Sequence, residues 1–320
     1  MNWLRYCRLT VGNQQFDLSN LRIRFYVRQA KIQTRITGEI RVYNLAKSTV
    51  AQLVGSNPFE SGTGGIEGQL LQLDAGYIDN HGLIYQGNVV KCQAGRETPL
   101  DTFVDFYVRD GDTAYNHGVI NKNFAPGSTQ QDHVKEVCNV CKQFGVTQGT
   151  VKGLSQTPYP RSVSLYGPIR DVMRTLAHSN NASWYINNMQ LCHVPLNSQG
   201  SGGAIMLNEN TGMIGMPQAV QGGVNVTALI NPAFQLEGTI QLDASEVNPL
   251  PWTENIDTDV QAGKAGIAGA FDGTYVIQSL EWRGDTRGQE WYANITAYGI
   301  QHGPGIGTEN IMPRYNGAGG

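Results

Sequence analysis

The first residues whose types and spacing could do chemistry are Arg283-Gly284-Asp285, within EWRGDTRGQEW (281–291). In an exported protein this triplet would suggest integrin adhesion. Here it lies between two stretches that alternate apolar and polar residues, which is typical of the turn between two antiparallel strands. Glycines at such a turn commonly supply the positive φ that the backbone needs. We therefore interpret the triplet as the tip of a hairpin and not as an adhesion motif.

A second group is Cys138-Asn-Val-Cys141 with His133 upstream, which has the spacing of half a zinc site. A structural zinc ion needs four ligands, and Cys192-His193 is the one plausible completion. Both cysteines also fall on the apolar face of a predicted helix, where a thiol behaves as a small hydrophobic group. We interpret them as core residues and predict no metal or cofactor, with metal binding by Cys138 and Cys141 left as an alternative.

Catalytic patterns are sparse. No two of the six histidines have the spacing of a zinc protease, and the sequence has neither a nucleophile elbow nor a phosphate-binding loop. A carboxylate pair for glycoside hydrolysis could come only from a loop cluster, and its setting, TENIDTDVQAGKAG, is typical of a solvated segment. The sequence therefore predicts no enzyme. The cluster consists of Glu254, Asp257 and Asp259.

Three arginines alternate with apolar residues in LRIRFYVR (21–28), which predicts a half-buried strand with its basic side chains outward. Such a face could bind phosphates, but only Tyr26 offers a stacking platform and the net charge is -3. Residues 1–50 hold nine Lys and Arg against two Asp and Glu, and 201–300 hold three against eleven. We expect the strand to form salt bridges with the acidic half of a neighbouring copy. The predicted subunit-interface residues are Arg22, Arg24 and Arg28.

The 320-residue composition fits a protein covered by partners, because only 15% of residues are charged. The N-terminus lacks the apolar core of a signal peptide and no apolar run reaches 18 residues, so we expect synthesis in a cytoplasm and no membrane span. The odd number of cysteines, five, then predicts reduced thiols. We interpret the tryptophans as core or interface residues. They are Trp3, Trp184, Trp252, Trp282 and Trp291.

The elements that must position these residues fall into four parts. Residues 1–110 alternate as strands, with a short helix at 47–55 and a hairpin connection at 79–82, and are expected to close into an antiparallel barrel. Residues 111–198 predict a small α/β domain. It has a helix capped by Ser128 or Thr129, a helix with Pro168 in its first turn, and a hairpin turning at Asn187-Asn188. After a linker at 197–204, residues 205–300 predict a second antiparallel barrel, and 301–320 a tail.

Four segments carry a resemblance to a known family, and one of them, VMRTLAHSNNASWYINNMQL (172–191), matches only the general form of a helix followed by a tryptophan-bearing hairpin. GMIGMPQAVQGGVNVTALINPAFQLEGTIQLD (212–243) and GTYVIQSLEWRGDTRGQEWYANITAYG (273–299) resemble the second-barrel strands and the last hairpin of phage baseplate hub proteins. IRVYNLAKSTVAQL (40–53) is similar to that family's first-barrel strand and helix. The family also resembles the base of type VI secretion spikes.

The resemblance implies a mainly β fold in which two tail-tube-like antiparallel barrels flank the α/β middle domain. It further implies a homotrimer whose six barrels form a pseudo-sixfold ring between the sixfold tail tube and the threefold spike. Its expected partners are the tube, spike, tape measure and other baseplate proteins, with DNA only in transit and the virion tail as its location. Two alternatives stay open: a tail-tip module that binds host glycan through tryptophan-bearing loops, and a hub with a hidden peptidoglycan hydrolase.

Overall fold

A computed structural model describes residues 4–12, 14–17, 21–54, 65–196, 198–200, 202–220, 223–242 and 273–299. The protein is mainly β, as predicted. The chain divides into two compact units. The first comprises 1–195, 230–233 and 281–292, and the second comprises 196–229, 234–280 and 293–320. The first unit thus contains the residues predicted to form the first barrel and the middle domain, together with the tip of the last hairpin.

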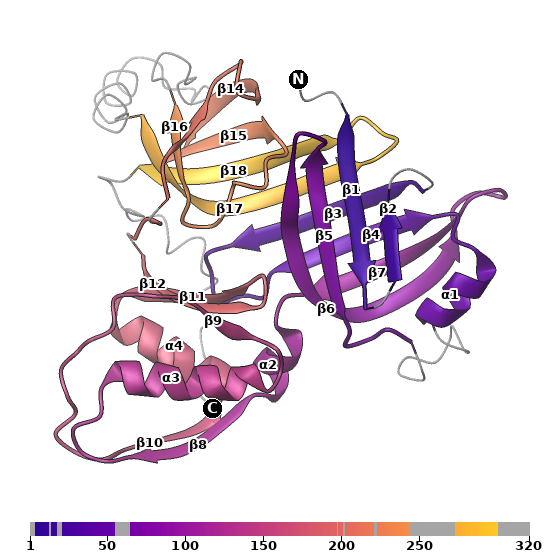
Figure 1. The fold of residues 1–320 in the computed structure, drawn as a ribbon. Coiled ribbons are helices and arrows are strands. Elements are labelled where there is room, and N and C mark those ends of the chain that lie inside the picture. Colours follow the sequence, from indigo (N-terminus) through magenta and orange to yellow (C-terminus); the bar gives the residue numbers. More distant parts are fainter. Residues whose placement is uncertain are drawn as a thin grey trace, which may run out of the picture. The chain divides into compact units, whose positions relative to one another are not determined.

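The first unit is built on an antiparallel sheet in the order β3-β4-β7-β6-β5-β1-β2 (Figure 1). The last residues of β17 lie beside β3, and among the described strands the sheet does not close on itself. A short helix, α1 (Lys47–Val54), follows β4 as predicted. The strands are β1 (Arg5–Val11), β2 (Gln14–Asp17), β3 (Ile23–Ala30), β4 (Thr37–Tyr43), β5 (Leu70–Tyr77), β6 (Asn80–Arg96) and β7 (Thr102–Arg109).

Strict alternation gives this sheet one apolar face. In β3, Ile23, Phe25 and Val27 are at most 2% exposed, while Arg22, Arg24 and Arg28 lie outward. Because successive strand residues point to opposite faces, register with β4 and β7 brings the apolar sets of all three strands together. Burial of these side chains supplies the main stabilisation of the unit.

One hairpin differs from its prediction. The connection expected at 79–82 is the two-residue turn Ile78-Asp79, since Tyr77 already pairs with Asn80. Gly82 lies within β6, where a Cβ atom would come 3.3 Å from Pro232, so this glycine permits close packing instead of forming the turn. The turn is held by Ile78, whose N–H donates to the carbonyl of Leu4.

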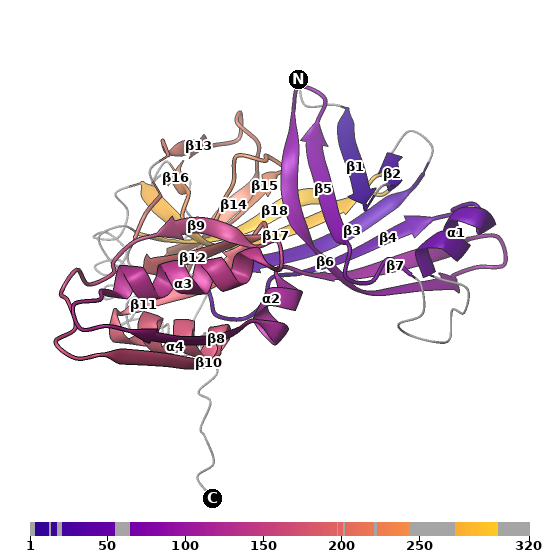
Figure 2. The same cartoon turned by 60° about the horizontal axis from the view of Figure 1, so that its bottom comes forward.

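The middle part of the first unit forms three layers. Helices α3 and α4 lie between the β8–β10 pair and the β9–β12–β11 sheet (Figures 1 and 2). Sequence patterns missed α2, β8, β9 and β10, and β9 pairs parallel to β12. The elements are α2 (Asp112–His117), β8 (Val119–Phe124), α3 (Gln130–Lys142), β9 (Thr147–Val151), β10 (Val163–Pro168), α4 (Ile169–Ser179), β11 (Ala182–Asn187) and β12 (Gln190–Pro195).

Helix and turn boundaries in this part follow their local chemistry. Thr129 caps α3 in a reciprocal capping box with Asp132, as one of the two predicted caps. Pro168 ends β10 and stands at the N-cap of α4, one position before the first turn in which it was expected. The β11–β12 turn is Asn188-Met189, one residue later than predicted, because these two residues adopt positive φ of 50° and 58°.

The second unit holds a sheet in the order β14-β15-β18-β17-β16-β13. β14 was not predicted, and β13 pairs parallel to β16 in a sheet predicted to be antiparallel. Residues 281–292 of the β17–β18 hairpin belong to the first unit. The strands are β13 (Ile205–Leu207), β14 (Met213–Val220), β15 (Gly223–Leu229), β16 (Thr239–Leu242), β17 (Thr274–Asp285) and β18 (Trp291–Gly299).

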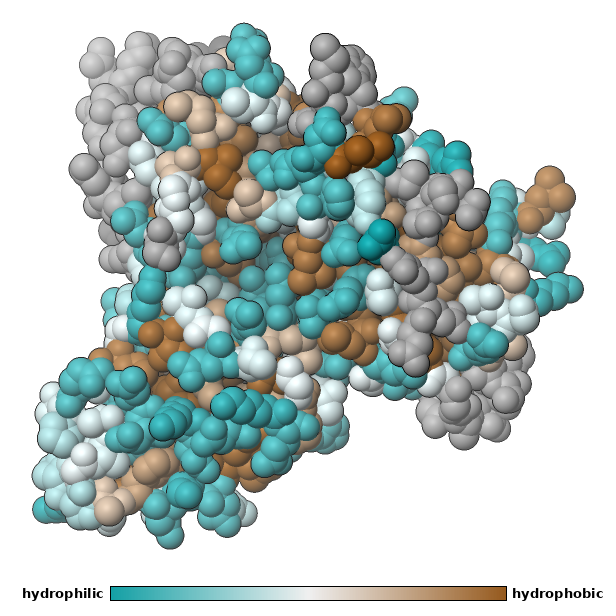
Figure 3. Space-filling model, viewed as in Figure 1, coloured by the Kyte–Doolittle hydropathy of each residue, from teal (hydrophilic) through white to brown (hydrophobic). Residues whose placement is uncertain are grey.

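The surface of the protein is mixed in hydropathy. Hydrophilic residues cover much of the molecule over α3, and hydrophobic residues are exposed in scattered patches (Figure 3). No helix in the described ranges has both the length and the apolar character needed to cross a membrane. The predicted tail at 301–320 lies outside the described residues.

Candidate functional site

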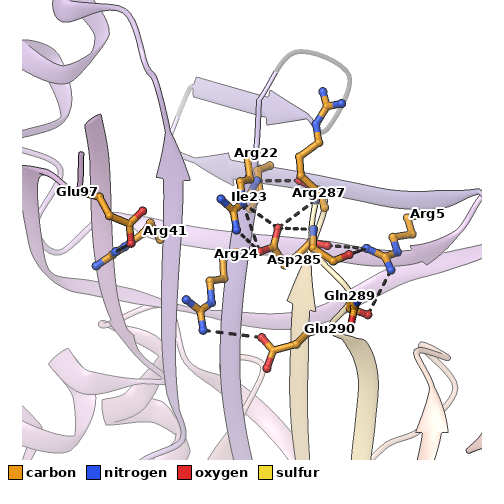
Figure 4. Close-up of polar contacts among 12 residues, drawn as sticks. Arg5, Arg22, Ile23, Arg24, Arg41, Glu97, Asp285, Arg287, Gln289 and Glu290 are labelled. Atoms are coloured by element: carbon orange, nitrogen blue, oxygen red, sulfur yellow. Dashed lines mark hydrogen bonds and ion pairs between the residues drawn. The ribbon is translucent and has the colours of Figure 1, made fainter. Parts of the chain in front are cut away.

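The arginine strand and the tip of the last hairpin meet in the first unit (Figure 4). The structure brings Arg22, Arg24 and Arg28 onto one face of the sheet, as predicted. Each faces a carboxylate of this chain's own last hairpin, at 2.7 Å (Arg22), 3.8 Å (Arg24) and 3.5 Å (Arg28). The respective partners are Asp285, Glu290 and Glu281. Part of the basic charge is therefore already compensated within the chain. Contact of these arginines with a neighbouring copy stays a prediction.

Asp285 organises the hairpin tip. Its Oδ1 accepts hydrogen bonds from the backbone N–H groups of Arg287 and Gly288, both at 3.0 Å. Arg22 donates to both carboxylate oxygens, from Nε at 3.1 Å and from a terminal nitrogen at 2.7 Å. Burial alone would raise the pKa of Asp285, but the Arg22 hydrogen bond and the two backbone donors outweigh it and hold this pKa below its usual value.

A fourth arginine, which sequence patterns did not single out, fixes the tip from β1. Arg5 donates to the backbone carbonyls of Asp285 at 2.7 Å and Gly288 at 2.6 Å. Its guanidinium also lies 5.3 Å from the ring centroid of Trp291, and the Trp291 indole donates to the carbonyl of Gly76. Arg5 and Gly288 are 283 positions apart in the sequence, so no local sequence pattern could predict this contact.

The glycines of the tip act differently from the prediction. Neither Gly284 nor Gly288 has positive φ. A Cβ atom on Gly284 would overlap the Phe25 ring, and one on Gly288 would lie 2.7 Å from a carboxylate oxygen of Asp285. Glycine is therefore required here by close approach of neighbouring groups, not by backbone conformation.

The same geometry excludes an adhesion role for the triplet. Asp285 is only 5% exposed and its carboxylate is occupied by Arg22 and the turn. An adhesion motif must present its aspartate to a receptor, and this aspartate is buried. The prediction that the triplet belongs to a hairpin tip is confirmed, with β17 ending at Asp285.

Arg41 on β4 pairs with two carboxylates on this face of the sheet. It binds Asp105 of β7 in a two-point contact at 2.7 and 2.9 Å, and it reaches Glu97 at 3.3 Å. The Arg41 guanidinium lies 3.8 Å from the ring centroid of Phe103. Arg41 and Asp105 are cross-strand partners in register, so their pairing is built into the sheet.

The groups that could have bound a metal are in the core. Cys138 and Cys141 are 1% and 0% exposed on α3, so their interpretation as core residues is confirmed. Burial raises the pKa of Cys141 to about 12, which disfavours the thiolate that a metal needs. Nowhere in the described ranges do three His, Cys, Asp or Glu side chains converge as metal ligands.

The structure describes three of the five tryptophans and none of the acidic cluster. Trp184, Trp282 and Trp291 are at most 4% exposed, as expected for core residues. Glu254, Asp257 and Asp259, the possible hydrolase cluster, lie outside the described residues, as do Trp3 and Trp252.

Comparison with known proteins adds a family and a fold. The family model "Baseplate hub gp41" matches residues 7–252. No curated protein matches the sequence.

Solved structures of tail proteins share the fold across nearly the whole chain. The 43 kDa tail protein of prophage MuSo2 from Shewanella oneidensis has a TM-score of 0.57 at 10% identity, over 92% of this chain and 98% of that one. The tail protein from Neisseria meningitidis MC58 gives 0.56 at 7% identity, over 92% and 97%. The E. coli c3393 protein gives 0.51 at 9% identity, over 91% and 76%. It is described as a type VI secretion component similar to the T4 tail proteins gp27 and gp5. At these identities the likeness establishes the fold alone.

Proposed function

The chain belongs to the baseplate hub gp41 family, and from this premise we propose that three copies form a ring that joins a tail tube to a spike. Its role as a structural component of a phage tail baseplate follows from the family. The family match over residues 7–252 is the observation that carries the proposal. The tail-protein fold over more than nine-tenths of the chain supports it.

The ring would use the sheet of each unit in the place of one tube-like barrel. Three chains with two such units each give six, which suits a sixfold tube on one face and a threefold spike on the other. The open sheet edges support this arrangement, because the unpaired N–H and C=O groups of an edge strand can pair with another chain. Among the described strands, β2 and β14 are such edges.

The proposed contact between copies uses the outward arginines of β3. Arg22 is engaged by Asp285, so the contact would rest on Arg24 and Arg28, which are 53% and 65% exposed and hold their own partners only loosely. Their expected counterparts are acidic residues of the second half of a neighbouring chain, where residues 201–300 hold eleven Asp and Glu. Opposite charges on the two contacting faces would favour alternation around a closed ring.

We further propose the tube, spike, tape measure and other baseplate proteins as partners. The protein would lie in the virion after assembly in the host cytoplasm, with DNA passing through the ring only in transit. The E. coli protein's description as a type VI secretion component similar to the tail proteins gp27 and gp5 supports a place in the tail assembly. We assign no reaction to the chain, since the family is a structural one.

The test is the mass and shape of the purified chain. Light scattering across a concentration range should give three times 34.9 kDa, and negative-stain images should show a threefold ring with six lobes and an open centre. A monomer that stays monomeric when candidate tube and spike proteins are added would contradict the ring.

No observation favours either alternative function. The three described tryptophans are buried and unavailable for stacking on a glycan. Lysis of a peptidoglycan suspension by the purified chain would revive the hydrolase alternative, and its acidic cluster would then be the first to substitute.

A further inference from the structure

A groove of about 350 Å³ lies on the outward face of β3, β4 and β7, beside the tip of the last hairpin. All of its lining residues belong to the first unit. Two tyrosines, three arginines and three carboxylates line it, and one of these carboxylates, on Asp105, is already bound by Arg41. The tyrosines are Tyr26 and Tyr107, the arginines are Arg24, Arg41 and Arg283, and the carboxylates are those of Glu39, Asp105 and Glu290.

Two of the arginines are placed against each other. Arg24 of β3 and Arg41 of β4 are direct cross-strand partners. Like charges directly opposite each other destabilise a sheet. Asp105 compensates Arg41 by its two-point contact at 2.7 and 2.9 Å. Arg24 has no equivalent, since its ion pair with the half-exposed Glu290 is 3.8 Å long.

Arg283 is the second arginine with donors to spare. Its nearest carboxylate, on Glu281, is 3.7 Å away, which is longer than a hydrogen bond. Its Nε is buried and has no hydrogen-bond partner among the described residues. The adjacent carboxylate of Asp285 cannot serve it, because that group is bound by Arg22 and the turn.

Arg283 is also held in place before any ligand arrives. Its guanidinium lies 4.9 Å from the ring centroid of Tyr26, so the planar cation rests on the sheet. Tyr107 lines the opposite side, with Glu39 between the two tyrosines in the strand register. A planar fork fixed over an aromatic ring matches the geometry of a carboxylate.

We propose that this groove binds an acidic side chain of a partner polypeptide, with its carboxylate held between Arg24 and Arg283. A polypeptide fits better than a nucleic acid because Glu39 and Glu290 border the two arginines and would repel a chain of phosphates. One carboxylate can enter between these negative groups, whereas a polyanion must pass over them. The ring contact proposed above rests on Arg24 and Arg28, whereas this binding uses Arg24 with Arg283, and peptide binding is measured separately from ring formation.

Binding can be measured on the full chain by fluorescence anisotropy. The probes are a rhodamine-labelled hexapeptide with two glutamates among glycines, the same peptide with glutamines, and a labelled hexathymidylate. We expect the glutamate peptide to bind at least tenfold more tightly than the glutamine peptide. The double variant Arg24→Met/Arg283→Met should abolish that preference. Arg287→Met is the matched control, because Arg287 belongs to the same tip and its side chain points away from the groove (Figure 4).

Three results would overturn the proposal. They are absence of binding up to millimolar peptide, equal affinity for the glutamate and glutamine peptides, and equal losses in the double variant and in Arg287→Met. Tighter binding of the oligonucleotide, lost in the same double variant, would assign the groove to nucleic acid. Thermal melting of each variant shows whether the loss comes from misfolding, and single Arg283→Gln, with a smaller change, repeats the test if the double variant is unstable.

Discussion

At the residue scale, two buried carboxylates in the first unit have opposite pKa shifts. Asp285 receives a guanidinium and two backbone N–H donors, and its pKa is lowered. Asp110 is fully buried and accepts a hydrogen bond from the backbone N–H of Met189 at 2.9 Å. Burial raises the pKa of Asp110 to about 7. Arg22 pairs with Asp285, so folding favours the ionised form of that carboxylate. Asp110 has no such cation beside it among the described residues, so folding favours its protonated form.

Replacing Asp285 by Asn should destabilise the protein. The amide keeps an acceptor for the two backbone N–H groups but loses the charge that pairs with Arg22. We expect a loss of about 1–3 kcal/mol in the free energy of unfolding at pH 7, measured by urea denaturation. Because the folded-state pKa is lowered, this contribution is fully present above the unfolded value of about 4 and is lost as pH falls through the lower folded-state pKa.

Glu290→Gln is the control for Asp285→Asn. It removes the 3.8 Å pair with the exposed Arg24, and such surface pairs contribute about 0–1 kcal/mol. If both variants lose the same small amount, the buried network of Asp285 does not stabilise the tip.

Replacing Asp110 by Asn should produce the opposite pH dependence. The folded-state pKa of Asp110 is raised, so the free energy of unfolding of the wild type is greatest below about pH 4. It falls as pH rises towards 7, because the buried carboxyl group must then ionise. The asparagine side chain carries no charge and retains an acceptor for the N–H of Met189. At pH 8 we expect the variant to be more stable than the wild type by about 2–4 kcal/mol, as judged by urea denaturation across pH.

Asp110→Ala separates charge from hydrogen bonding. It lacks the acceptor for the Met189 N–H, so it should be less stable than Asp110→Asn at every pH. Parallel curves of unfolding free energy against pH for wild type and Asp110→Asn would show that Asp110 does not titrate with folding.

At the element scale, the hairpin tip and β3 depend on close packing. Gly284→Ala would push a methyl group into the ring of Phe25. Overpacking of this kind costs about 1–3 kcal/mol, which thermal melting would detect. Gly203→Ala is the matched control, because nothing lies within 4 Å of a Cβ there.

A second substitution tests the cause of that loss. Phe25→Leu alone should destabilise by removing buried ring atoms. In the Gly284→Ala background it should cost less, since the smaller side chain leaves room for the added methyl group. Strict additivity of the two changes would contradict the clash.

What the sequence predicts well is local and periodic. Helices α1, α3 and α4 follow from apolar spacing and caps, and β3 from its strict alternation. The missed strand β9, TQGTV, is short and mostly polar, and β14 contains Gly215 and Pro217, so neither has a strand pattern. The partners of the arginine strand could not be predicted, because Arg22 and Asp285 are 263 positions apart.

At the scale of the whole molecule, the charge asymmetry of the sequence acts partly within one chain. The basic N-terminal segment supplies Arg22, Arg24 and Arg28, and the acidic C-terminal segment supplies their carboxylate partners in the last hairpin. The two weak pairs leave Arg24 and Arg28 open to further carboxylates. The proposed contact between copies therefore depends on these two arginines, while Arg22 stabilises the subunit itself.

Charge reversal tests this division of roles. Arg24→Glu with Arg28→Glu should weaken self-association, measured by light scattering, while leaving the melting temperature within a few degrees, because each lost pair is exposed and contributes about 0–1 kcal/mol. Arg22→Glu should instead lower the melting temperature, since it leaves the buried Asp285 without its partner. Arg174→Glu, on α4 with a side chain as exposed as that of Arg24, is the control for each single reversal, Arg24→Glu or Arg28→Glu, because all three change the net charge by two. If the double variant assembles as the wild type does, the ring contact lies elsewhere. If Arg174→Glu weakens assembly equally, net charge and not this strand is responsible.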